Sequence, residues 1–248
     1  MSTFLGEFFG TMVLIVFGCG VVANVVLKKS RANGGGDGWI VITAGWAFAV
    51  MVGVFCSIAV GGAAELNPSV TLFKYLVGVY PSPATALMMV VAQFAGAILG
   101  AAIVWLAYLP HWEVTEDQGT KLAVFCTAPA IKGKNIEALI TEIIATAFLI
   151  TIFWAIATKF VQGNAGVPAG VGVYITGMVI WAVGLSLGGP SGYAMSAARD
   201  LGPRIAHAIL PIAGKGSSDW GYAWVPVVGP LLGAVLAFMI CKGTGIVG

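Results

Sequence analysis

Four ionisable residues lie inside or beside long apolar stretches of the chain: Glu7, Glu142, Arg199 and Asp200. Burying a charge in a membrane segment is costly, so such residues mark functional positions unless a partner satisfies them. Arg199 carries five N–H donors, which can bind a hydroxyl or carbonyl oxygen while repelling cations. Arg199 therefore indicates a cationic gate on a polar path. The alternative is an arginine that pairs with Asp200 or extends to the membrane surface.

The two glutamates are placed alike in the two halves of the chain. Each precedes a threonine by four residues, and the glutamates stand 135 positions apart. One interpretation is a proton relay. The other is that each carboxylate accepts hydrogen bonds from irregular backbone in its own half. The symmetric placement favours the second interpretation, because a relay does not need two equivalent copies, and we expect Glu7 and Glu142 to support the structure around the path.

Two apolar segments, residues 67–77 and 196–206, are too short to cross a bilayer as helices, which takes about 20 residues. Each follows a Gly-rich run, at 61–64 and 188–192. Short apolar segments interrupted by Gly or Pro, at matching places in two halves, point to a site near the bilayer midplane. We therefore expect two re-entrant half-helices.

The first residues of both short segments predict helix N-termini at the centre of the membrane. Asn67 is a strong N-cap, and Pro68 is a preferred first helical residue. Ser196 is also a good N-cap, whereas Ala197 is only a good helix former. Each N-terminus carries a partial positive charge of roughly half a unit, so two of them facing one another repel cations and hydronium. The unwound backbone before each cap must line a wet path, because lipid satisfies none of its polar groups.

Six long apolar segments supply the frame for these residues. They are residues 4–27, 39–60, 84–108, 137–158, 168–187 and 223–242. Three spans per half is an odd number, so the second half enters the membrane from the opposite side, as in an inverted repeat. The chain is thus predicted to be an all-α polytopic membrane protein with six transmembrane helices and two re-entrant half-helices. It forms one membrane channel domain, 1–248, with repeats at about 1–110 and 135–248 and a connecting loop at about 110–134.

The composition excludes several other classes of protein. Hydrophobic residues make up 59% of the 248 residues and charged residues only 9%, whereas soluble domains carry about a quarter charged residues. The net charge of +2 and the lack of a basic run predict no nucleic-acid partner. The four cysteines lie far apart and the two histidines are isolated, so we expect no metal site, no cofactor and no enzymatic nucleophile–base set.

Four stretches carry a resemblance to a known family. They are EFFGT (7–11), ELNPSVT (65–71), GYAMSAARDLGPR (192–204) and DWGYAWVP (219–226). On these the chain resembles the major intrinsic proteins, or aquaporins, and more closely their glycerol facilitators, over essentially its whole length. The resemblance implies an aquaporin-like right-handed helix bundle and a passive channel for glycerol and other small neutral solutes, with water. It also implies a homotetramer with one pore per chain, in the plasma membrane, with both termini cytoplasmic.

The resemblance also implies a selectivity filter, which by motif offset consists of Trp46, Gly184, Tyr193 and Arg199. In this filter the rings face the carbon atoms of a solute, its hydroxyls face the arginine, and the glycine leaves room for three carbons. Asp200, directly after the arginine, is the pattern of the glycerol-conducting branch and is expected to support the pore. Trp46 lies 21 residues before the first cap, one more than usual, and its alternative role is packing or anchoring at the membrane interface.

Three departures from the family pattern bear on function. Ser196 and Ala197 replace the usual Asn and Pro, and Ser69 replaces an Ala. Because a serine lacks the amide donor and is smaller, we expect a wider and more one-sided midplane constriction. Glu65 replaces the usual His. It is either a helix-dipole partner or loop hydrogen-bonder, or an anionic inner mouth that discourages anions and tolerates neutral acids and polyols.

Other functions remain open at this point. One is a channel mainly for undissociated lactic acid or another small neutral metabolite. A second is an ion-coupled secondary transporter, since transporters also use inverted repeats and broken helices. A third is a structural or adhesive membrane protein without conduction. Cytoplasmic termini would place most lysines and arginines outside, against the positive-inside tendency.

Overall fold

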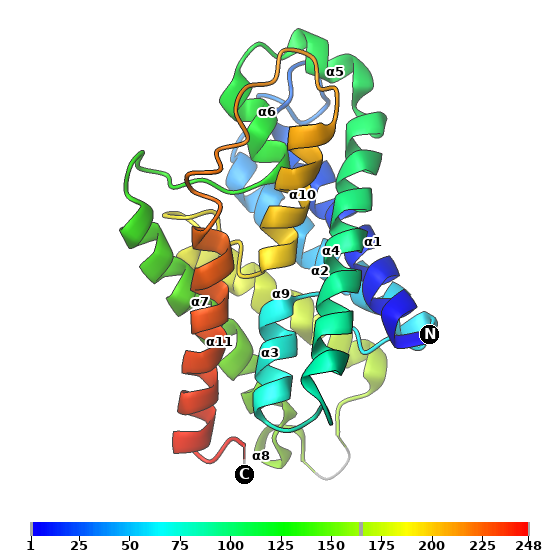
Figure 1. Ribbon diagram of the computed structural model, residues 1–248, viewed down its shortest axis with the longest axis vertical. Coiled ribbons are helices and arrows are strands. Elements are labelled where there is room, and N and C mark those ends of the chain that lie inside the picture. Colours follow the sequence, from blue (N-terminus) through cyan, green and yellow to red (C-terminus); the bar gives the residue numbers. More distant parts are fainter. Residues whose placement is uncertain (1, 164–165, 248) are drawn as a thin grey trace.

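The computed structural model describes residues 2–163 and 166–247, and within these ranges the chain is a bundle of helices (Figure 1). Six of the described helices are long and apolar enough to cross a membrane. They are α1 (Ser2–Val26), α2 (Gly38–Ala59), α4 (Pro83–Ala107), α7 (Asn135–Ala157), α9 (Ala169–Leu187) and α11 (Val225–Gly243). The six predicted spans are confirmed, and their limits differ from those of the helices by at most two residues.

Two shorter helices, α3 (Pro68–Leu76) and α10 (Ala197–Ile209), begin near the centre of the bundle and run toward opposite ends (Figure 1). We call the end that carries the C-terminus the terminal end and the opposite one the distal end. Helix α3 runs toward the terminal end and α10 toward the distal end. The fold is therefore the predicted inverted repeat, in which each half contributes three spans and one half-helix.

Glycines allow the helices of each repeat to approach closely. α1 packs against α2 and α4, and α7 packs against α11 and α9. A Cβ added at Gly96 of α4 would lie 2.2 Å from the Phe8 carbonyl oxygen on α1. A Cβ added at Gly233 of α11 would lie 2.7 Å from the Ile143 carbonyl oxygen on α7. Small residues at such contacts are the usual means of packing helices in membranes, where no hydrophobic effect drives them together.

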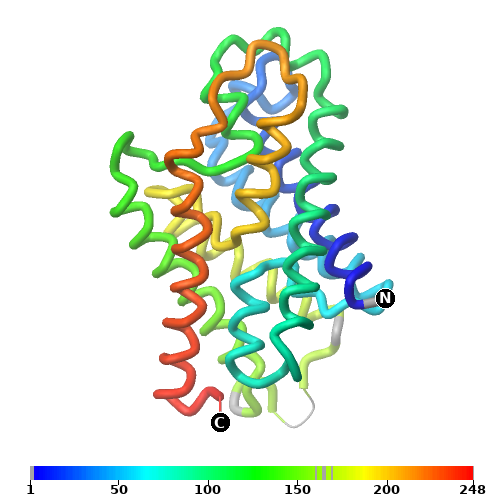
Figure 2. The backbone as a smooth tube through the Cα atoms, in the orientation of Figure 1, coloured from blue at the N-terminus to red at the C-terminus, as the bar shows by residue number. Residues whose placement is uncertain are grey.

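The connection between the repeats is more ordered than a polar loop. It contains α5 (Leu109–Val114) and α6 (Gln118–Phe125), which the sequence analysis missed, and Figure 2 shows this segment folded over the distal end. Asp117 caps α6 by accepting the Thr120 N–H. Hydrogen bonds from the Thr120 hydroxyl and N–H lower the pKa of the exposed Asp117 carboxyl. Helix α6 packs against both α1 and α10, so this connection belongs to the bundle. At the terminal end, α8 (Lys159–Gln162) follows α7.

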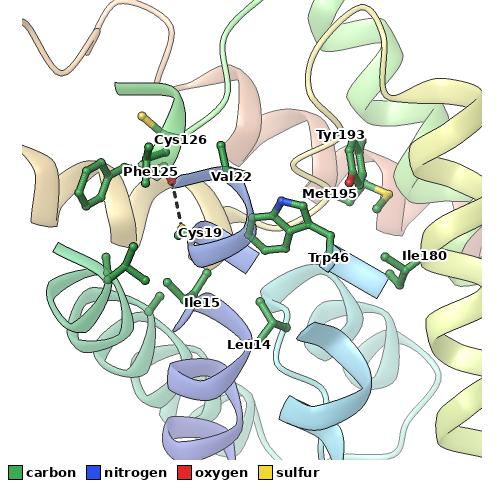
Figure 3. Close-up of a cluster of buried hydrophobic side chains, with 14 of the residues drawn as sticks. Leu14, Ile15, Cys19, Val22, Trp46, Phe125, Cys126, Ile180, Tyr193 and Met195 are labelled. Carbon is green, nitrogen blue, oxygen red and sulfur yellow. Dashed lines mark hydrogen bonds between the residues drawn. The ribbon is translucent and has the colours of Figure 1, made fainter. Parts of the chain in front are cut away.

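A buried apolar cluster joins the two repeats beside the centre of the bundle (Figure 3). Cys19 of α1, Trp46 of α2 and Tyr193, which precedes α10, belong to it. The Cys19 thiol lies 3.9 Å from the carbonyl oxygen of Phe125, which brings α6 into the same cluster. The cluster thus fixes the aromatic residues that the sequence analysis assigned to the filter.

Candidate functional site

The backbone before each half-helix has the same unusual conformation in both repeats. Ala64 and Leu66 precede α3 with φ angles of 54° each, and Tyr193 and Met195 precede α10 with φ angles of 41° and 50°. Residues other than glycine avoid this region at a cost on the order of 1 kcal/mol or more each. The pattern stands at the same distance from both half-helices, so the surroundings must hold both segments in this conformation.

Glu7 on α1 holds the first of these segments. Its Oε1 accepts the Glu65 N–H at 2.9 Å, and its Oε2 accepts the Leu66 N–H at 2.8 Å. Gln93 on α4 donates its side-chain amide to the same carboxylate at 2.7 Å. Glu7 and Gln93 are completely buried, so these bonds lie in a region of low dielectric where they are strong. This is the contact that the structural interpretation of Glu7 requires.

Glu142 on α7 holds the second segment in the same way. Its Oε1 accepts the Ser191 hydroxyl at 2.6 Å and the Ala194 N–H at 2.8 Å. Its Oε2 accepts the Met195 N–H at 2.8 Å. In each repeat a buried carboxylate on the first span therefore binds the residue with positive φ that stands directly before the half-helix cap.

The two caps meet at the centre. The side-chain oxygen of Asn67 accepts the Ser69 N–H at 2.9 Å, and its amide nitrogen donates across the junction to the Met195 carbonyl oxygen at 2.8 Å. Ser196 Oγ accepts the Arg199 N–H at 3.2 Å. Both half-helices thus have the N-caps that their sequences predict. The Asn67 amide ties the two repeats together, a bond that Ser196 does not reciprocate.

A cavity of about 250 Å³ runs past both caps. Its lining includes Trp46, Glu65, Asn67, Lys74, Tyr193, Ser196 and Arg199. It therefore brings together six of the twelve predicted site residues, from both repeats. Pro68 and Ala197 instead border a separate apolar hollow between α3, α4 and α11. Glu7, Glu142 and Asp200 are fully buried behind the wall.

Aromatic residues and one arginine form the distal part of the cavity. The guanidinium carbon of Arg199 lies 3.9 Å from the centroid of the Trp46 ring, a stacking contact that orients the cation without using its N–H donors. Gly184 lies behind the Tyr193 ring, where an added Cβ would be 2.9 Å from Cζ. Gly18 on α1 makes room for Trp46, since an added Cβ would lie 2.2 Å from its ring. The sequence analysis missed Gly18.

Asp200 pairs with Arg204 and not with the adjacent Arg199. Its Oδ1 accepts hydrogen bonds from Arg204 at 2.8 and 2.9 Å, and its Oδ2 accepts the N–H and the hydroxyl of Thr127, each at 2.7 Å. Arg204 also donates to the carbonyl oxygens of Ser218 and Asp219. Asp200 and Arg204 are completely buried, and their network ties α10 to two distal segments and leaves Arg199 to the cavity. The Asp200–Arg204 spacing of four residues was the available signal.

Glu65 belongs to a second cluster, on the terminal side of the caps. One of its oxygens accepts a hydrogen bond from the Tyr80 hydroxyl and lies 2.9 Å from the Lys74 ammonium. The other oxygen accepts the Thr71 hydroxyl at 2.5 Å. Lys74 and Tyr80 were not singled out from the sequence, although Lys74 lies in the last turn of α3, where a cation is favoured.

Comparison with known proteins decides the family. The family model described as "Major intrinsic protein" matches residues 1–241. The chain belongs to the major intrinsic protein family. Within this family it is 50% identical to the glycerol uptake facilitator protein of Streptococcus pneumoniae, over 97% of this chain and 98% of that one. It is 48% identical to the probable glycerol uptake facilitator protein of Thermotoga maritima, over 95% and 96%.

A solved structure of the same family agrees with the fold. The aquaglyceroporin of Plasmodium falciparum superposes with a TM-score of 0.83 at 26% identity, over 97% of this chain and 95% of that one. The chain is therefore an integral, multi-pass membrane protein of a channel family. In the described ranges, no three His, Cys, Asp or Glu side chains gather as a metal site would need. The arrangement suits hydrogen bonding to a neutral solute.

Proposed function

We propose that this major intrinsic protein is a passive channel through which glycerol and other small neutral solutes, together with water, diffuse across the plasma membrane. The observation that carries the proposal is the single cavity that passes both caps and has Arg199 stacked on Trp46 in its distal part. The names of the relatives point to the same substrate class.

The filter selects by presenting an apolar wall beside a cationic donor. The rings of Trp46 and Tyr193 contact the carbon atoms of the solute, while the N–H groups of Arg199 bind its hydroxyl oxygens and replace hydration. The guanidinium charge repels cations. A molecule with hydroxyls on one side and carbon on the other fits both walls, whereas an ion loses its hydration without an equivalent replacement.

The centre of the pore adds a second barrier against cations. The N-termini of α3 and α10 point toward one another, and each carries a partial charge of roughly +0.5. Asn67 and Ser196 both line the cavity there. Asn67 brings an amide, and Ser196 brings a smaller hydroxyl that already accepts the Arg199 N–H. The constriction is therefore wider and more one-sided than a pair of asparagines would make, which favours a broader range of solutes.

The glutamates argue against ion-coupled transport. A coupling carboxylate must be free to bind and release its ion, but Glu7 and Glu142 each accept two backbone N–H groups that hold a strained segment. Loss of the backbone hydrogen bonds to either glutamate would disturb the pore itself. Both residues therefore serve as fixed supports in our account, and transport is passive.

Orientation and assembly follow the family in this proposal. Both termini are cytoplasmic, so the terminal end faces the cytoplasm and the distal end, with α5 and α6, faces outward. Exposed apolar side chains such as Phe17, Phe48, Leu87 and Phe148 cover the outer faces of the spans, where they meet lipid or the neighbouring subunits of a homotetramer.

Stopped-flow light scattering on vesicles containing the purified protein tests the function. We expect glycerol permeability well above that of protein-free vesicles, unchanged by imposed sodium or proton gradients. Glycerol entry at the protein-free rate would contradict the proposal, and a flux that follows an ion gradient would show a transporter. Lactic acid permeability measured across a range of pH distinguishes a lactic acid channel from a glycerol channel. A lactic acid channel would conduct the undissociated acid much faster than glycerol.

A further inference from the structure

The terminal half of the cavity contains an ion pair with no counterpart in the other repeat. Lys74 Nζ lies 2.9 Å from Glu65 Oε1, and both residues line the cavity. The positions that correspond to them before and within α10 are Ala194 and Pro203, each at the same distance from its cap. The second repeat therefore offers nothing equivalent, and its own ion pair, Asp200–Arg204, is completely buried away from the cavity.

The two partners of this ion pair are exposed to different extents. The side chain of Glu65 is 0% exposed, whereas that of Lys74 is 24% exposed. The carboxylate is occupied by the hydroxyls of Thr71 and Tyr80 as well as by the lysine. An ammonium has three donors, and Glu65 takes one of them. The lining of the cavity therefore includes a partly exposed lysine whose charge is balanced by Glu65 and which has two further donors.

The position of this lysine complements that of Arg199. Lys74 stands seven residues after the Asn67 cap, which is roughly 10 Å along α3 toward the terminal end at 1.5 Å per residue. Arg199 stands on the first turn of α10, on the distal side. One continuous cavity thus has a cationic donor on each side of its centre.

We propose that Lys74 is a second solute-contacting position, which donates hydrogen bonds to the hydroxyl oxygens of a polyol on the terminal side of the pore, and that Glu65 is its positioning residue. This inference rests on the proposed glycerol conduction. Fixing the ammonium on Glu65 keeps a long, mobile side chain out of the path and cancels its attraction for anions. The solute then moves from the donors of Arg199 past the caps to those of Lys74, with its hydroxyls bound at both positions.

Three variants in vesicles test this role: K74M, K74R and the double variant E65Q/K74M. K74M leaves the buried Glu65 carboxylate without its cation, which can prevent folding. The double variant removes both charges together and therefore tests the role of Lys74 even if K74M fails to fold. We expect glycerol permeability to fall about tenfold in K74M and E65Q/K74M, the effect of one lost hydrogen bond to a charged donor. Water permeability should change less than twofold, because water fits the same space and keeps its own partners. K74R retains the donors and should keep the ratio of glycerol to water near that of the unmodified protein.

K121M is the matched control, because it also removes a lysine held by a hydrogen-bond acceptor, but Lys121 is buried and bonds the Ala213 carbonyl oxygen outside the cavity. It should leave the glycerol-to-water ratio unchanged. A purely structural role for Lys74 would lower glycerol and water permeability in parallel, and that result, or no change in either, overturns the inference. A ratio of glycerol to water permeability that falls as far in K74R as in K74M also overturns the inference. If the unmodified protein does not conduct glycerol at all, the proposed function fails and this inference fails with it.

Discussion

α3 and α10 begin at the same junction and run to opposite ends, and they differ in what surrounds them. Both are preceded by residues with positive φ that a buried glutamate holds, Leu66 by Glu7 and Met195 by Glu142. Around this shared arrangement the repeats diverge. α3 has an amide cap and an ion pair on the cavity wall, whereas α10 has a hydroxyl cap and an ion pair enclosed in the protein. In our proposal the shared part supports the pore, and the two caps and the Glu65–Lys74 pair, which line the cavity, determine what passes.

The enclosed ion pair of α10 gives the largest expected effect. R204M leaves Asp200 buried without its cation, which typically costs about 3–5 kcal/mol of stability. We expect a greatly lowered melting temperature in detergent and little protein in the membrane. The double variant D200N/R204M should recover part of the loss, because it no longer buries a lone charge. Equal stability of R204M and the unmodified protein would show that this network does not hold α10.

The two glutamates should be equivalent in spite of the differences around them. E7Q and E142Q each replace one acceptor oxygen by a donor, which leaves one backbone N–H without a partner at a cost of about 1–3 kcal/mol. We therefore expect both variants to lower the melting temperature by a similar amount and to reduce glycerol and water permeability together. A variant that folds normally but loses only gradient-driven uptake would instead assign that glutamate to ion coupling.

The caps should have a smaller and more selective effect. S196N/A197P gives α10 the same N-cap and first helical residue as α3 and narrows the junction with a second amide. Glycerol permeability should fall by about twofold or less, and larger solutes such as erythritol should lose more, because a constriction acts on size. The melting temperature reports whether the proline is tolerated. Unchanged permeability ratios across water, glycerol and erythritol would show that Ser196 does not set the width of the pore.

The frame of the molecule could be predicted from the sequence because local signals specify it. A span requires only a sufficient length of apolar residues, and a half-helix is marked by a cap after a Gly-rich run, as at Asn67 and Ser196. The helices α5 and α6 were missed because they have only 6 and 8 residues, too few for the length of an apolar stretch to indicate a helix.

The partners around the site could not be predicted, because they come from distant parts of the chain. Gln93 reaches Glu7 across 86 positions, and Thr127 reaches Asp200 across 73. No local pattern encodes such contacts. Lys74 was not singled out from the sequence, although it lies in the last turn of a half-helix where a cation is favoured, and only the structure shows its ion pair with Glu65.

The most direct test of the central claim compares glycerol and water permeability in vesicles containing the unmodified protein and R199M. Methionine keeps an apolar contact with Trp46 but removes the donors that bind solute hydroxyls. Hydrogen bonds to a charged group contribute about 1.5–3 kcal/mol, so glycerol permeability should fall at least about tenfold. The water permeability and the melting temperature should stay close to those of the unmodified protein. Glycerol permeability that is unchanged in R199M would contradict the account.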